Sequence, residues 1–239
     1  MSRSAAALAL AARTLAASSP AFTRGNLYHA YRRRAGGRGS FAEFSAGPLA
    51  ARLAGGPIRG LLPASVRWDG ARLPREWDAY FPKAILLVDR REILDLFVAS
   101  GALATAKLAV VCVDGSPSSV VAWLRRGIRA GARAPIGFLH DAATAVYPFL
   151  LEPLATLLEH AHGEAIAYAD LGLPARGLAA ERFPLAGDGV PRRERVRELE
   201  ALPPSALVAY AARKMLSMVP GDPLMAPLAG RTQNAGGVR

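Results

Sequence analysis

Four short apolar runs, each followed closely by an aspartate, constrain the fold of this chain more than any other feature. The runs are Ala84–Val88, Leu108–Val113, Ile136–Leu139 and Ile166–Tyr168. The segments between them have the apolar spacing of amphipathic helices, as in Arg90–Ser100. Short strands that are apolar throughout and alternate with helices are typical of a parallel sheet covered on both faces. The sequence therefore predicts an α/β fold with a four-stranded parallel sheet.

The distribution of charge divides the chain into three parts. Residues 1–83 contain 13 Lys and Arg against 4 Asp and Glu, whereas residues 84–189 contain 9 against 11. We expect a basic helical region with a connector over 1–83, the α/β domain over 84–189, and C-terminal helices with a loose tail over 190–239. Basic surfaces favour nucleic acid or anionic membranes, so the net charge of +11 indicates a negatively charged partner.

Three short helices are predicted in the basic region. The first covers Ser4–Ala17, and Thr23 caps a second that runs to about Arg34. Ser40 and Glu43 form a capping-box pattern for the next helix. Because proline fits a first helical turn but not an interior, Pro48 is expected to restart that helix. The pattern indicates a helix-turn-helix or winged-helix-like unit, although many small helical bundles give the same pattern.

The second of these helices carries the residues expected to bind DNA. They are Arg24, Arg32, Arg33 and Arg34. A solvated basic helix face without a ligand is the alternative interpretation.

The start of the chain is compatible with two interpretations. Its Ala- and Leu-rich stretch resembles a transit peptide or a weak secretory signal, but Arg13 interrupts it early, which favours a surface helix. We therefore expect a cytoplasmic protein. No apolar run reaches the roughly 18 residues of a membrane span, so no membrane partner is expected. The single cysteine, Cys112, excludes a disulfide framework and a cysteine-rich zinc site.

Aspartates follow all four predicted strands. They are Asp89, Asp114, Asp141 and Asp170. In open α/β sheets ligands bind beyond the carboxyl ends of the strands, and carboxylates gathered there repel one another unless a cation joins them. Mg²⁺ prefers oxygen ligands. Asp89, Asp114 and Asp141 are therefore candidate Mg²⁺ ligands, while ordinary turn and helix caps are the alternative role for these aspartates.

Three segments of the α/β region resemble the Toprim domain of the A subunit of type IIB DNA topoisomerases (topoisomerase VI), a family that includes meiotic recombination initiators. The segments are ILLVDRREILDLF (85–97), VDGSP (113–117) and GFLHDAATAVYPF (137–149). The resemblance implies that Asp89 stands at the acidic position ending the first strand. It also implies that Asp141 is the first residue of an Asp-x-Asp pair, and that the first and third strands are neighbours.

The segment TRGNLYHAYRR (23–33) resembles the part of the family's winged-helix domain that carries the strand-cleaving tyrosine. At that position this chain has His29, and Ala143 replaces the second aspartate of the pair. A histidine cannot form the tyrosyl–phosphodiester link. With a shifted alignment Tyr28 or Tyr31 would be the nucleophile, and Tyr28 is the weak catalytic candidate.

These observations favour a DNA-binding protein related to the topoisomerase VI A subunit that lacks strand cleavage. Two alternatives remain open. One is a Mg²⁺-dependent phosphoryl-transfer enzyme or nuclease that uses the aspartate cluster, and the other is a non-catalytic scaffold subunit. Association as a homodimer or with a partner subunit is compatible with each of them.

Overall fold

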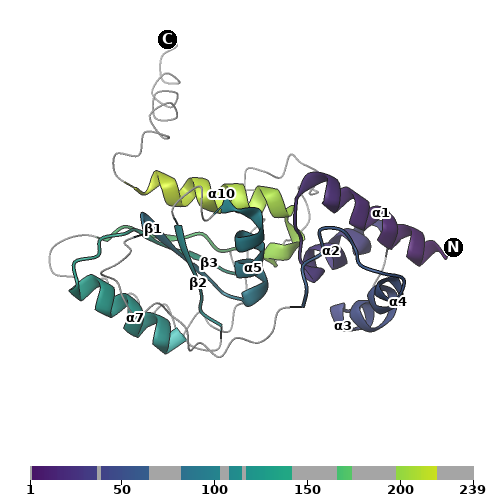
Figure 1. Cartoon of the computed structure of the whole chain (residues 1–239), viewed down its shortest axis with the longest axis horizontal. Coiled ribbons are helices and arrows are strands. Elements are labelled where there is room, and N and C mark those ends of the chain that lie inside the picture. The colour runs from purple at the N-terminus through teal and green to yellow at the C-terminus, as the bar shows by residue number, and fades with distance from the viewer. Residues whose placement is uncertain are drawn as a thin grey trace, which may run out of the picture.

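The structure is a computed structural model of the whole chain, and it describes residues 2–36, 39–64, 82–102, 108–114, 117–141, 166–173 and 198–219. Figure 1 shows a group of short helices beside a sheet that has helices on both faces. We call the described residues of 2–64 the head. The predicted loose tail and the segment between the third and fourth strands, residues 142–165, lie outside the described residues.

The sheet has four parallel strands in the order β2-β1-β3-β4, which confirms the predicted α/β class. The strands are β1 (Ala84–Val88), β2 (Leu108–Cys112), β3 (Ile136–Leu139) and β4 (Tyr168–Asp170). The last strand begins two residues later than predicted, so Asp170 lies within it. From β1 the chain passes to β2 on one side of β1 and then crosses to β3 on the other side of β1. The order of the strands therefore switches between β1 and β3.

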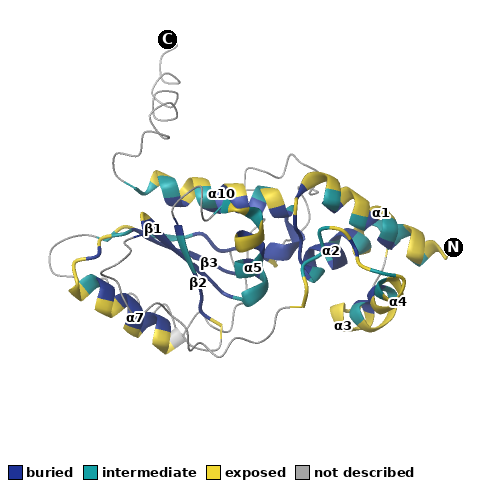
Figure 2. Cartoon of the chain, in the orientation of Figure 1, coloured by how far each residue is buried: buried dark blue, intermediate teal, exposed yellow. Residues whose placement is uncertain are grey.

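Helices cover both faces of the sheet. On one face lie α5 (Arg91–Ser100) and α10 (Pro204–Ser217), and on the other lies α7 (Pro117–Arg129) (Figure 1). In β1, Leu86 and Val88 pack into the cluster formed with α5 and α10, whereas Ile85 and Leu87 pack into the cluster formed with α7. Successive strand residues point to opposite faces, and Figure 2 shows the two central strands, β1 and β3, buried along their length. This is why the strand sequence is apolar without alternation.

The head consists of α1 (Arg3–Ser18), α2 (Arg24–Ala35), α3 (Phe41–Phe44), the π-helical turn η1 (Ser45–Leu49) and α4 (Ala50–Ala54). The two predicted helix caps are confirmed. Thr23 and Ser40 each accept a hydrogen bond from the backbone three residues later and complete a capping box. The head has a core of its own around Leu8, Phe22 and Leu27.

The prediction that Pro48 begins a new helix is wrong. Pro48 lies inside η1, and the residues on either side of this turn, Phe44 and Ala50, both have right-handed helical backbone angles. Proline has no N–H to donate to the preceding turn, and its ring would clash with a carbonyl of a regular α-helix. The wider π-helical turn accommodates it, so the chain continues from α3 into α4 without a restart.

Near its C-terminal end, the described chain returns to the head. The short 3₁₀ helix η2 (Leu199–Ala201) packs against α2 and then leads into α10. Of the part predicted to form C-terminal helices, residues 190–197 lie outside the described residues. None of the described helices has both the length and the apolar character that crossing a bilayer requires.

Candidate functional site

Asp89 and Asp141 lie together where β1 and β3 end. The backbone N–H of Asp141 donates to Oδ2 of Asp89 at 2.8 Å. The expectation that the first and third strands are neighbours is therefore confirmed, and so is the proximity of these two residues. Asp114 follows β2 and is exposed, whereas Asp170 belongs to β4 and bonds Nε2 of His140 at 3.1 Å.

A guanidinium joins the carboxylates at this edge. Arg90 contacts the carboxylates of Asp89, Asp141 and Glu200, with 3.5 Å from Nε to Oδ1 of Asp89 and 3.1 Å from NH1 to Oε2 of Glu200. Oδ1 of Asp141 also accepts the backbone N–H of Leu199 at 2.7 Å. Arg90 thus supplies the positive charge that sequence reasoning assigned to Mg²⁺. Within the described part of the chain, no group of three or more His, Cys, Asp or Glu could hold a metal ion.

Burial sets the electrostatics of this cluster. It raises the pKa of Asp89, while the neighbouring positive charge of Arg90 opposes the increase. Burial likewise raises the pKa of Glu200, and the hydrogen bond from Thr23 and the charge of Arg90 oppose it. Carboxylates taken out of water need such partners, since an unpaired buried charge is strongly destabilising. The cluster is therefore a network of ion pairs with buried carboxylates, and its members are not solvated turn residues.

Glu200 connects the sheet edge to the head. Its carboxylate accepts from Thr23 Oγ1, and its backbone carbonyl accepts from Nδ2 of Asn26 at 2.7 Å. Thr23 and Asn26 are also the two members of the capping box of α2. Gly25 lies between them, and a Cβ at this position would overlap the Glu200 carboxylate. The first turn of α2 is thus the docking point of η2.

Further along α2, two side chains extend this contact. His29 Nε2 pairs with Glu198 at 2.9 Å, and the hydrogen bond with His29 lowers the pKa of Glu198. The guanidinium of Arg33 donates to the carbonyl of Ala201 at 3.2 Å. His29, at the position implied for the cleaving tyrosine, is therefore part of the junction between the head and η2.

The two tyrosines of α2 have their hydroxyls engaged within the head. Tyr28 donates to the carbonyl of Gly39 at 2.9 Å, and its ring packs edge-on against Phe41 at 5.5 Å between centroids. The hydroxyl of Tyr31 bonds that of Ser4 at 2.8 Å. Both tyrosines therefore contribute to the packing of the head.

The arginines predicted to bind DNA divide into two places. Arg32, Arg33 and Arg34 share the last turn of α2, where the helix dipole favours cations. The guanidinium of Arg32 lies 5.3 Å from the centre of the Tyr28 ring, and that of Arg34 reaches Thr14 on α1. Arg24 lies at the opposite end of α2 and lines a cavity instead. The structure thus brings three of the four together.

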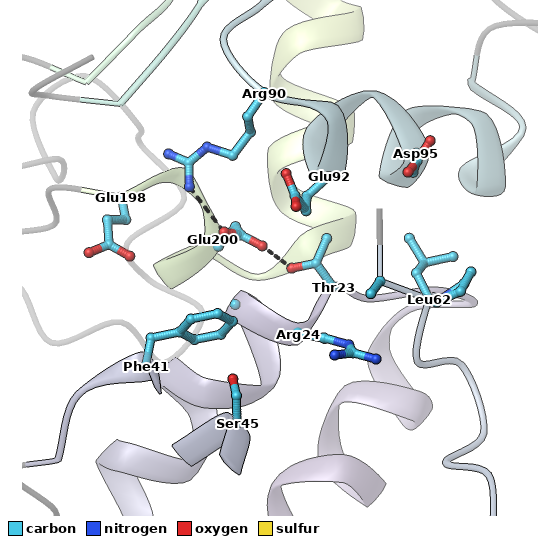
Figure 3. Close-up of a pocket in the computed structure, with 13 residues that line it drawn as sticks. Thr23, Arg24, Phe41, Ser45, Leu62, Arg90, Glu92, Asp95, Glu198 and Glu200 are labelled. Atoms are coloured by element: carbon cyan, nitrogen blue, oxygen red, sulfur yellow. Dashed lines mark hydrogen bonds and ion pairs between the residues drawn. The ribbon is translucent and has the colours of Figure 1, made fainter. Parts of the chain in front are cut away.

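That cavity has a volume of about 500 Å³ and lies between the head and the start of α5 (Figure 3). Its wall on the head side includes Arg24, Phe41 and Ser45, and its other wall includes Arg90, Glu92 and Glu200. It therefore adjoins the switch in strand order, which is where open α/β folds place their ligands.

Sequence reasoning missed two residues of the cluster. Arg90 had a local signal, since it directly follows the aspartate that ends β1. Glu200 had none, because it is separated from Arg90 by 110 positions and belongs to a 3₁₀ turn.

Comparisons of the chain with protein-family models, with curated proteins and with solved structures found no match.

Proposed function

We propose that this chain is a DNA-binding protein, a divergent relative of the topoisomerase VI A subunit that does not cleave strands. The charge of the head carries this proposal. Residues 1–64 contain nine arginines and one carboxylate, Glu43, which is engaged in the capping box with Ser40. Among the described residues of the head, the exposed arginines are Arg3, Arg13, Arg32, Arg33, Arg52 and Arg59. Such a surface attracts phosphates and releases their counterions.

Two features of the junction support binding without cleavage. Strand cleavage by a tyrosine needs a hydroxyl that can attack phosphorus in line, together with a metal-held phosphate. The Tyr28 hydroxyl donates to a backbone carbonyl, and Arg90 stands between the two carboxylates that a metal would bridge. The neighbouring positions of β1 and β3 support a Toprim-like domain, and the capped α2 supports a winged-helix-like head, as parts of the same proposal.

Magnesium-dependent phosphoryl transfer is the competing function, and one observation favours it. Asp89 and Asp141 lie side by side at the switch in strand order. For Mg²⁺ to bind both, the Arg90 side chain must first leave them. Stabilisation of the native protein by millimolar Mg²⁺ that Asp89→Asn abolishes would favour this function over the first.

A matched pair of variants tests DNA binding. One replaces Arg32, Arg33 and Arg34 by Gln, and the other replaces Arg125, Arg126 and Arg129 by Gln. Both remove three positive charges, but the second set lies on α7, at the far end of the molecule from the head (Figure 1). We expect the first variant to lose affinity for short DNA duplexes of every sequence alike, and the second to lose much less.

Fluorescence anisotropy at low salt measures both affinities, and circular dichroism checks that both variants fold. Equal losses would mean that net charge alone attracts the DNA. A larger loss for the α7 variant would place the binding surface on the sheet domain and overturn the assignment to the head.

A further inference from the structure

Two residues that line the cavity between the head and α5 have polar atoms that are unmatched within the described part of the chain. Nε of Arg24 and Oγ of Ser45 are buried, and neither has a hydrogen-bond partner among the described residues. Both belong to the head wall of the cavity (Figure 3). Buried polar atoms without partners are rare in proteins and call for an explanation, such as a ligand.

The opposite wall contributes an unmatched negative charge. Glu92 lines the cavity from the first turn of α5, and no hydrogen bond or ion pair joins it to another described residue. Burial is the main cause of the raised pKa of Glu200, and the nearby charge of Glu92 adds to the increase. Figure 3 shows Glu92 on the wall facing Arg24 and Ser45.

The remaining charges that line the cavity are already paired. Asp95 pairs with Arg91 at 2.8 Å, and Glu198 pairs with His29 at 2.9 Å. Glu200 pairs with Arg90. Counting only pairings among the described residues, one cation, one hydroxyl and one carboxylate of the lining remain for a ligand, and the two remaining charges sum to zero.

The rest of the lining is apolar. Phe41, Leu62 and Pro63 contribute to it. A volume of about 500 Å³ is in the range of cavities that enclose small organic ligands. A ligand that matches this lining carries an anionic group, a cationic group and an apolar part.

We propose that this cavity binds a free α-amino acid with an apolar side chain. Its carboxylate accepts from the guanidinium of Arg24 and the hydroxyl of Ser45, and its ammonium group donates to Glu92. Its side chain packs against Phe41 and Leu62. Of the four arginines predicted to bind DNA, this site uses Arg24 alone. Arg32, Arg33 and Arg34 lie at the other end of α2, so either proposal can fail without the other.

Thermal unfolding of the full chain with individual common α-amino acids at millimolar concentration provides the first test. A ligand that binds the native state raises the unfolding midpoint by mass action. We expect stabilisation by one or more apolar amino acids. The matched amine without the carboxylate and the matched carboxylic acid without the amino group should leave the midpoint unchanged. Stabilisation by no amino acid, or equal stabilisation by either analogue, overturns the proposal.

Calorimetric titration of variants with the stabilising amino acid provides the second test. Arg24→Gln and Glu92→Gln should each weaken binding by about tenfold or more, since each removes a charged hydrogen-bond partner. Ser45→Ala should weaken it less. The controls Arg59→Gln and Asp114→Asn remove exposed charges outside the cavity and should bind as the unmodified chain does. Unchanged affinity in both Arg24→Gln and Glu92→Gln also overturns the proposal.

Discussion

At the carboxyl edge of the sheet one guanidinium is shared by three carboxylates, whereas in the head many arginines accompany a single carboxylate. Asp89 and Glu200 are buried, and Arg90 is their common partner. The arginines of the head are mostly exposed. Buried charges must be paired inside the protein, but exposed charges can remain available to an external partner.

This contrast separates two roles. The sheet edge uses its charges to hold the molecule together, because Arg90 and Glu200 join β1, β3 and the first turn of α2. The head retains a surplus of positive charge that its own residues do not neutralise. We therefore expect substitutions at the edge to affect stability, and substitutions in the last turn of α2 to affect DNA binding.

Removing the shared cation should have the largest effect. Arg90→Met leaves three carboxylates without their common partner, two of them deeply buried, and should lower the free energy of unfolding by about 3–5 kcal/mol. Urea denaturation at neutral pH measures this loss. The control Arg91→Met breaks a partly exposed ion pair with Asp95 and should cost less than about 1 kcal/mol. Equal losses of unfolding free energy in the two variants would mean that Arg90 is no more important than an exposed arginine, and would contradict its pairing with the buried carboxylates.

The close approach of η2 to α2 can be tested with a single methyl group. Gly25→Ala should lower the free energy of unfolding by about 1–3 kcal/mol, because the added Cβ overlaps the Glu200 carboxylate. Alanine is otherwise the better helix former, so a decrease in the free energy of unfolding requires a steric conflict. In the control Gly47→Ala, the added Cβ contacts no atom within 4 Å, and stability should stay the same or increase. Stabilisation by Gly25→Ala would contradict the docking of η2 on α2.

The pH dependence of stability should reveal the buried carboxyl of Glu200. Its pKa is raised above the usual 4.5, so the native state keeps a proton that the unfolded chain releases. The stability gained from this group is present below pH 4.5 and is lost as the pH rises through the raised pKa. Glu200→Gln should therefore flatten the fall in unfolding free energy above pH 4.5, measured by urea denaturation at a series of pH values. An identical pH profile would show that Glu200 titrates normally.

The smallest expected effect concerns Tyr28. Tyr28→Phe removes the hydrogen bond to Gly39 and should cost about 0.5–1.5 kcal/mol of stability, with DNA affinity unchanged. The unmodified chain should form no covalent adduct with supercoiled plasmid in the presence of Mg²⁺, as judged by denaturing electrophoresis. An adduct that disappears in Tyr28→Phe would establish Tyr28 as a nucleophile and restore strand cleavage.

The local elements could be predicted from the sequence because local chemistry determines them. Apolar runs identified the strands, and the side chains of Thr23 and Ser40 identified two helix starts. Of the four strand aspartates, Asp89 and Asp141 lie together at one edge of the sheet as predicted, whereas Asp114 is exposed and Asp170 bonds His140. Pro48 misled the prediction, since a π-helical turn tolerates a proline that a regular α-helix does not.

The partners within the site could not be predicted, because they come from segments far apart in the chain. Neither the spacing nor the composition around residue 200 indicates that Glu200 meets Arg90 and Thr23. Helical spacing also did not separate Arg24 from the other arginines of α2. Thr23 placed Arg24 at the first residue of the helix, but its place in the wall of the cavity depends on how the head packs against α5.

The salt dependence of DNA affinity tests the central claim most directly. For the unmodified chain, the logarithm of the binding constant for a short duplex should fall steeply and linearly with the logarithm of the salt concentration. Replacing Arg32, Arg33 and Arg34 by Gln should reduce the steepness by about one for each arginine that contacts a phosphate, and the α7 variant should leave it unchanged. A slope that is the same in the unmodified chain and in the α2 variant would contradict DNA binding by the head.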